Sequence, residues 1–247
     1  MDNALPQIVS NSKALEPTKA SKNKLREVVR RTMGDPFFLK LQKVNYKFKH
    51  LFYSHFTKNA GYDWNYYHGQ AASSNFTYTL FAQTLFEQFN PKTVVDVGCG
   101  GGGFSKAFLD LSCDVRSFDY SSDAIAVAQS RGVTSAQQID ITKIDAIPAN
   151  GDLCICLEVA EHIPETYALH LCKVLSKIAP TLALTAAPPG QGGHLHVNEQ
   201  PQSYWIEKME SCGMEYDAGA VAQIRSVFAG RMGTDYDDNL MIFRQQQ

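Results

Sequence analysis

Hydrophobic residues in the second half of the chain form short runs that alternate with amphipathic stretches. The short runs predict buried strands at residues 93–97, 114–119, 136–141, 152–158 and 181–186. Between them, apolar positions recur at helical spacing in residues 104–111, 123–130 and 165–178. Alternating strands and helices predict a parallel sheet with right-handed crossovers. Two more runs, at 213–216 and 239–244, predict a closing strand pair, and 203–211 predicts a helix before it.

The first ninety residues follow a different pattern. Residues 1–20 are polar, without apolar periodicity, and predict a disordered tail. Residues 21–90 predict a basic, helical and aromatic cap in front of a core at 91–247, and the cap ends in an amphipathic helix at 71–89. The aromatic residues of 61–69 have two interpretations. They form a lid over a cofactor or acceptor, or they pack the N-terminal helices onto the core.

Composition restricts the class of protein. A hydrophobic content of 44% and a charged content of 19% are typical of a soluble globular protein. No apolar run reaches the roughly 18 residues of a membrane span, and the N-terminus lacks a secretory apolar region, so we expect a cytoplasmic protein without a membrane span. The six cysteines lack metal-type C-x-x-C pairs and predict reduced core residues.

The net charge of −2 conceals an uneven distribution. Residues 13–58 contain 12 Lys and Arg against 3 Asp and Glu, so the rest of the chain is acidic. A basic segment suits a phosphate-bearing or anionic-glycan substrate or an acidic membrane face. We favour the alternative that it is a solvated helix face, because no Arg and aromatic residues interleave as in nucleic-acid-binding surfaces.

The sequence VVDVGCGGGG at 94–103 places a glycine loop between a predicted strand and a predicted helix. This unit binds nucleotides in α/β folds. Gly98, Gly100 and Gly103 fit the weak G-x-G-x-x-G pattern of dinucleotide enzymes. However, Asp96 precedes the loop, and its carboxylate would repel a pyrophosphate but favour the sulfonium and amino groups of an adenosyl cofactor.

Two later strand ends carry candidate cofactor contacts. Asp119 ends the second predicted strand, where the carboxylate reaches a ribose diol at the switch point of a parallel sheet, and Tyr120 follows to pack on adenine. Asp140 ends the third, as an acceptor for the adenine amino group, and the backbone N–H of Ile141 is a donor beside it.

These segments, together with LEVAEH at 157–162, resemble class I S-adenosylmethionine (SAM) methyltransferases from about residue 62 to 243. The resemblance implies a Rossmann-like, seven-stranded, mostly parallel α/β sheet with one antiparallel edge strand. It implies a reaction in which an acceptor attacks the cofactor methyl group. The implied cofactor-binding residues are Asp96, Gly98, Gly100, Gly102, Asp119, Tyr120, Asp140, Ile141 and Glu158.

Methyl transfer depends mainly on alignment, but a hydroxyl acceptor also needs a base. Two segments at the carboxyl edge of the sheet supply candidates. Glu158, Glu161 and His162 have i, i+3, i+4 spacing, and a glycine-rich loop carries His194 and His196. The run HVNEQP at 196–201 resembles the acceptor loop of bacterial sugar and secondary-metabolite methyltransferases, so His196 is our first choice of base and His194 our second.

The same residues also suit a divalent metal. Glu158, Glu161, His162 and His196 form a mixed oxygen and nitrogen set for Mg²⁺, Mn²⁺ or Zn²⁺. E-x-x-E-H followed by a later His resembles metal-dependent small-RNA 2′-O-methyltransferases, and E-x-x-E-H alone also occurs in ubiquinone-pathway O-methyltransferases. In relatives without a metal, the acid and His line the acceptor pocket.

We therefore expect an O-methyltransferase for a sugar or another small hydroxylated metabolite. His196 is the expected base, and His194, Glu161 and His162 are further candidate catalytic residues. The alternatives are a metal-dependent RNA 2′-O-methyltransferase, a catalytically silent SAM-binding protein and, least favoured, an NAD-dependent oxidoreductase. The acceptor and the oligomeric state stay open.

Overall fold

The computed structural model describes residues 66–67, 69, 75–229, 231 and 234–246. All of them belong to the unit that runs from Phe52 to Gln247. The predicted tail at 1–20 and most of the predicted cap at 21–90 lie outside these residues, as does the basic segment at 13–58. In the described part of the chain, no helix is both long and apolar enough to cross a bilayer.

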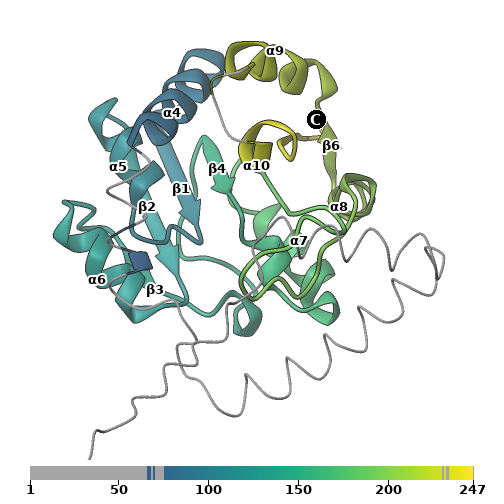
Figure 1. The fold of residues 1–247 in the computed structure, drawn as a ribbon, viewed down its shortest axis with the longest axis horizontal. Helices are drawn as coiled ribbons and strands as arrows, with labels where there is room; N and C mark the ends of the chain where they lie inside the picture. Colours follow the sequence, from purple (N-terminus) through teal and green to yellow (C-terminus); the bar gives the residue numbers. More distant parts are fainter. Residues whose placement is uncertain (1–65, 68, 70–74, 230, 232–233, 247) are drawn as a thin grey trace, which may run out of the picture. The chain divides into compact units, whose positions relative to one another are not determined.

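The core is a seven-stranded sheet in the order β3-β2-β1-β4-β5-β7-β6 (Figure 1). β7 is antiparallel to both of its neighbours, and the other pairs are parallel. This confirms the predicted fold class; the antiparallel strand lies one position in from the edge, because β6 pairs with its outer side. The strands are β1 Thr93–Val97, β2 Asp114–Asp119, β3 Gln137–Gln138, β4 Leu153–Cys156, β5 Thr181–Leu184, β6 Met214–Tyr216 and β7 Met241–Gln245.

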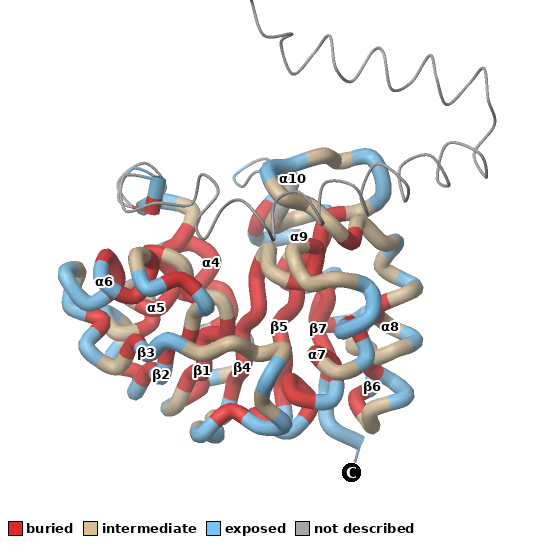
Figure 2. The backbone as a smooth tube through the Cα atoms, turned by 90° about the horizontal axis from the view of Figure 1, so that it is seen from below, coloured by how far each residue is buried: buried red, intermediate tan, exposed pale blue. Residues whose placement is uncertain are grey.

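Helices cover both faces of the sheet. Alternate residues of a strand point to opposite faces, so Val94 packs with α4, α5 and α9 whereas Val95 packs with α7 and α8. Figure 2 shows the buried strands between these two layers. The helices are α4 Asn75–Phe89, α5 Gly103–Asp110, α6 Ser122–Ser130, α7 Ala168–Leu175, α8 Gln202–Glu210, α9 Ala218–Phe228 and α10 Thr234–Asp237, with 3-10 turns η1 Ile141–Lys143, η2 Ala160–His162 and η3 Glu165–Tyr167.

The predicted bounds of the strands and helices agree best with the structure where the apolar periodicity and the turn residues indicate the same limit. β1 and β2 have the predicted limits, whereas β3 contains only Gln137 and Gln138 of the predicted 136–141. Helix α9 was not predicted, although Asp217 caps its start by accepting from the Ala220 N–H at 2.8 Å. Its small residues gave a weak periodic pattern, so its existence depends on packing against α4 and β7.

Aromatic side chains join α4 to the helices that follow the glycine loop. Phe81 is fully buried, with its ring centroid 5.1 Å from Phe104 of α5 and 5.5 Å from Phe228 of α9. Burying such a side chain contributes about 1.5–3 kcal/mol relative to leaving it in water. The cluster therefore holds the first turn of α5 in place, which fixes the end of the glycine loop.

Candidate active site

The glycine loop folds over the carboxyl end of β2. The N–H groups of Gly98 and Cys99 both donate to the Phe118 carbonyl, at 2.7 and 3.0 Å. Gly98 has φ +81°, and an added Cβ would lie 2.2 Å from Val159 Cγ2. Only glycine fits there, because the left-handed backbone and the close approach of Val159 both exclude a side chain. The loop after β1 and the segment after β4 therefore touch.

Asp119 lies at the end of β2 directly beside this loop. Its Oδ2 accepts from the Gly100 N–H at 2.9 Å and its Oδ1 from the Ser121 N–H at 2.8 Å. Burial raises the pKa of the carboxyl, and the hydrogen bonds from Ser121 and Gly100 oppose that rise. The residue is half-buried, and its contact with a ribose diol stays a prediction.

Asp96 lies under the loop, on the side of β1 that faces α5. Its carboxyl is only 3% exposed, and Ser105 Oγ donates to it at 2.5 Å. A second hydroxyl, Ser117 Oγ, lies 2.8 Å from Ser105 Oγ. Burial raises the Asp96 pKa to about 7. Its predicted contact with a cofactor stays a prediction.

The segment after β3 forms a short turn at the same edge. Asp140 caps it by accepting from the Thr142 N–H at 3.1 Å, and Lys143 Nζ lies 2.7 Å from its other oxygen. Burial alone would raise the Asp140 pKa, but the hydrogen bonds from Lys143 and Thr142 lower it. His170 Nε2 donates to the carbonyls of Ile141 and Ile144, at 3.1 and 2.9 Å, and so fastens the turn to α7.

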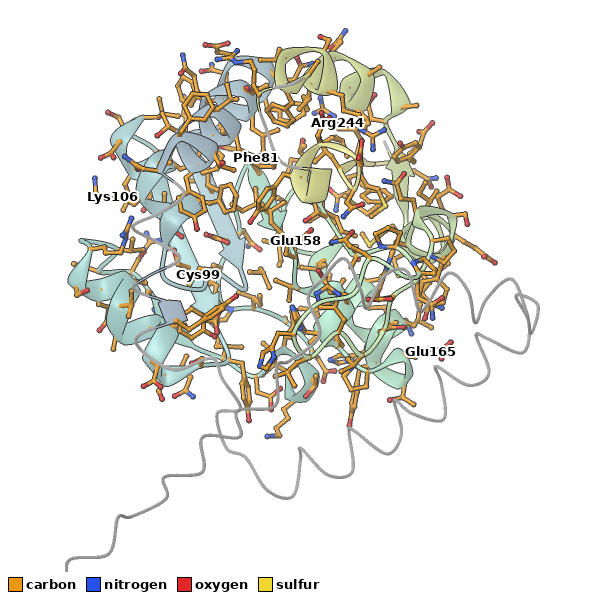
Figure 3. The ribbon with its side chains drawn as sticks, in the orientation of Figure 1. Phe81, Cys99, Lys106, Glu158, Glu165 and Arg244 are labelled. Carbon is orange, nitrogen blue, oxygen red and sulfur yellow. The ribbon has the colours of Figure 1, made fainter. Side chains whose placement is uncertain are left out.

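Two carboxyl groups meet after β4. Glu158 has φ +56°, an uncommon conformation for a residue with a side chain, and its N–H donates to Thr185 Oγ1 at 2.8 Å. Glu161 is fully buried beside it. Burial and the nearby charge of Glu158 raise the Glu161 pKa to about 9. In Figure 3, Glu158 lies toward the middle of the molecule, as does Cys99 of the glycine loop, whereas Lys106 lies at the rim.

His162 faces the loop that follows β5. Its Nδ1 lies 3.2 Å from the Leu195 carbonyl, which can only accept, so the proton is on Nδ1 and Nε2 carries the lone pair. Burial and the neighbouring His196 lower the His162 pKa to about 4. The imidazoles of His162 and His196 are in edge contact, with centroids 5.0 Å apart. The N–H groups of Val197 and Asn198 donate to the Glu161 carbonyl, at 2.8 and 2.9 Å.

The structure gathers three of the four predicted metal ligands. One ligand atom each from Glu161, His162 and His196 lies within 4.8 Å of the others. Glu158 is outside this set, so the prediction that it completes the site is not met by this geometry. Mixed carboxylate and imidazole donors fit Zn²⁺, Mn²⁺ or a related divalent ion better than Ca²⁺. His194 is exposed and does not belong to the set either.

Comparison with known proteins finds similarity to methyltransferases in the middle of the chain. Residues 95–177 match a family model described as a methyltransferase domain. A ubiquinone biosynthesis O-methyltransferase from Paraburkholderia phytofirmans is 37% identical over 93 residues, which are 35% of this chain and 40% of the relative. Residues 95–177 therefore resemble a methyltransferase domain. The chain matches less than half the length of this relative.

Two solved structures show the same methyltransferase fold. A plantazolicin methyltransferase, solved with S-adenosylhomocysteine, aligns with a TM-score of 0.55 and 13% identity over 84% of this chain and 97% of that one. The magnesium protoporphyrin IX methyltransferase from Synechocystis PCC 6803, also with S-adenosylhomocysteine, aligns with a TM-score of 0.53 and 18% identity over 70% and 83%. Both alignments show that this chain shares the fold of these two methyltransferases.

The site also contains residues that sequence reasoning missed. Tyr67 is buried against α6, and a Cβ on Gly100 would lie 3.7 Å from its ring. Burial and the charge of Asp119 raise the Tyr67 pKa, and a hydrogen bond to Ser121 opposes this. This contact agrees with the lid interpretation of the aromatic stretch, which stays a prediction. The sequence marked Tyr67 only as one of several aromatic residues, whereas His170 and Glu199 have long-range or loop contacts that no local pattern marked.

Proposed function

We propose that this chain transfers the methyl group of SAM to a hydroxyl oxygen of a small molecule, a sugar or another hydroxylated metabolite. The observation that carries the proposal is the position of His196 at the edge of the sheet where the glycine loop and Asp119 also lie. The name of the Paraburkholderia relative, an O-methyltransferase in ubiquinone biosynthesis, supports an oxygen acceptor on a small molecule.

Bound SAM supplies a methyl group on a sulfonium that is already activated toward attack. The protein has to align the acceptor and remove its proton, because a neutral alcohol is a poor nucleophile. As the acceptor oxygen bonds to the methyl carbon, its proton passes to a lone pair of His196. The carbon–sulfur bond breaks and its electron pair stays on sulfur, so the products are a methyl ether and S-adenosylhomocysteine.

The cofactor half of the proposal has a direct test. Asp119→Ala should weaken S-adenosylhomocysteine binding by about 10- to 100-fold, as expected for the loss of charge-assisted hydrogen bonds to a ribose. Asp114→Ala is the matched control, because Asp114 is on the same strand but is exposed and pairs with Arg116. Equal calorimetric affinities for Asp119→Ala and the control would contradict the assignment of Asp119.

The acceptor half is tested with methyl-labelled SAM and separate pools of protein, RNA, glycan and small molecules, each with and without a chelator. Label in the small-molecule or glycan pool that survives chelation supports His196 as a simple base. Binding of S-adenosylhomocysteine without label in any pool would support the silent-binder alternative instead.

A second candidate function is a metal-assisted transfer to an RNA 2′-hydroxyl. It is motivated by the ligand set of Glu161, His162 and His196 and by the basic residues at 13–58. A divalent ion held there would lower the pKa of the acceptor hydroxyls. This candidate predicts label in RNA that disappears with chelator, and RNA affinity that falls steeply with salt. Salt-insensitive or absent RNA binding would exclude it.

A further inference from the structure

The loop that follows β5 is folded around one carboxylate, that of Glu199. Its Oε2 accepts from the Gly190 N–H at 2.8 Å, and its Oε1 accepts from the Gly192 N–H at 2.7 Å. Oε1 also lies 3.3 Å from Nδ1 of His196, three residues earlier in the chain. The Glu199 carboxyl group thus accepts from two backbone N–H groups, which can only donate.

Both Glu199 oxygens are acceptors in these contacts, and this determines the tautomer of His196. The proton must be on Nδ1, where it is donated to Glu199, and Nε2 therefore carries the lone pair. Both side chains are largely shielded from water, with exposed fractions of 11% and 15%. Water therefore competes only weakly for the hydrogen bond between His196 and Glu199, so the orientation of the imidazole is well determined.

The space beside Nε2 depends on Gly193. A Cβ built on this glycine would lie 2.1 Å from His196 Nε2 and 2.3 Å from Cε1. Any other residue at position 193 would push the imidazole out of its place. Two residues of the loop thus contact the two edges of the same ring: Glu199 binds the Nδ1 edge, and Gly193 lies against the Nε2 edge, where a side chain would clash.

We propose that Glu199 is the positioning residue of this site, which holds His196 with its Nε2 lone pair available to take the proton of the acceptor hydroxyl. This inference rests on the proposed function. As the proton moves to Nε2, the Glu199 carboxylate faces the imidazolium that forms and stabilises it, without taking up the proton itself. The same carboxylate closes the glycine loop, so the base and the loop are ordered together.

The first test is Glu199→Gln, measured with the acceptor pool that the wild-type enzyme labels. We expect kcat to fall by about 10- to 100-fold, part of the roughly 10²- to 10⁴-fold that a positioned base contributes. The KM for SAM and the affinity for S-adenosylhomocysteine should change little. The matched control is Gln191→Ala, which removes the hydrogen bond from Asn239 Nδ2 to this loop and leaves Glu199 in place.

A spectroscopic readout separates positioning from simple loosening of the loop. In protein labelled with ¹⁵N-histidine, His196 of the wild type should show protonated Nδ1 and unprotonated Nε2, and Glu199→Gln should give a mixture of tautomers. Gln191→Ala should keep the wild-type tautomer. If Glu199→Gln retains both the tautomer and the kcat of an active wild-type enzyme, Glu199 is not the positioning residue.

A second variant displaces the His196 imidazole and leaves Glu199 unchanged. Gly193→Ala should displace His196 and lower kcat by a similar factor, again with S-adenosylhomocysteine binding retained. Full activity of Gly193→Ala would overturn the inference. If the proposed function itself is wrong, the result is different: the wild-type protein transfers no label to any acceptor pool.

Discussion

Replacing Asp96 by Asn should change how the stability of this protein depends on pH. The Asp96 carboxyl is buried under the glycine loop, and Ser105 Oγ is its nearest hydrogen-bond partner, at 2.5 Å. Asparagine has almost the same shape, is neutral at every pH and can still accept from Ser105. The substitution therefore removes the charge and leaves the packing and one hydrogen bond in place.

The magnitude follows from the Asp96 pKa. Burial raises it from 3.8 to about 7, and at 1.36 kcal/mol per unit this corresponds to about 4 kcal/mol as an upper bound. Between these two values the folded protein binds a proton that the unfolded chain has lost. The free energy of unfolding therefore falls as pH rises from about 4 to about 7, and this contribution is constant above the folded-state pKa.

The assay is urea unfolding at intervals from about pH 5 to about pH 8, on wild type and Asp96→Asn in parallel. Over this range the wild type should lose about 2–3 kcal/mol relative to Asp96→Asn, so the variant is the more stable protein at the alkaline end. Other groups titrate in the same range, but they contribute equally to the wild-type and Asp96→Asn curves. Their contribution is therefore absent from the difference between the two curves. Asp110→Asn, an exposed position on α5, is the control for loss of one carboxylate and should follow the wild-type curve.

A constant difference between the wild-type and Asp96→Asn curves would refute this reasoning, because it would mean that Asp96 is equally protonated in the folded and unfolded chains. The same variant has a functional readout. An ionised Asp96 favours the sulfonium of SAM, which S-adenosylhomocysteine lacks. Asp96→Asn should therefore weaken SAM binding more than S-adenosylhomocysteine binding, so stability would be gained at the expense of cofactor binding.

Three further substitutions test the packing around the site. Gly98→Ala should lower the free energy of unfolding by about 2–4 kcal/mol, from left-handed strain and from the clash with Val159. Adding Val159→Ala should recover only the part due to the clash, as measured by urea unfolding. Tyr67→Ala should weaken S-adenosylhomocysteine binding about 10-fold in calorimetry, whereas Tyr66→Ala, at an exposed residue, should not. Phe81→Ala should lower thermal stability by about 3–5 kcal/mol through a core cavity, and a smaller loss would show that α4 and α9 repack.

Sequence reasoning predicted the fold well because the fold depends on local patterns. β1 is a short and mostly buried run, whereas β2 alternates exposed and buried residues before it ends at Asp119. β3 and α9 were harder to predict from the sequence. Only two residues of β3 pair with β2, and α9 has small apolar residues whose helical spacing is visible only beside α4. Tertiary packing, rather than propensity, decided these two elements.

The site could be predicted only where its residues follow a strand. Asp119 ends β2 and Glu161 follows β4, so topology places both at one edge of the sheet. The role of Glu199 depends on how a glycine-rich loop turns back on itself, and no periodic pattern encodes that turn. The inward orientation of Asp96 was missed for a related reason, because the pleat places it on the α5 face rather than toward the crevice.

The two segments that carry the candidate chemistry are joined through their backbones. The Glu161 carbonyl accepts from Val197 and Asn198, and the Leu195 carbonyl accepts from His162. Neither segment can shift without breaking hydrogen bonds of the other, so His162 and His196 form one preorganised unit. An enzyme gains most from groups that are already in place when charge develops. This joining explains how a loop rich in glycine can hold the His196 imidazole in place: long-range hydrogen bonds supply the order that its own sequence lacks.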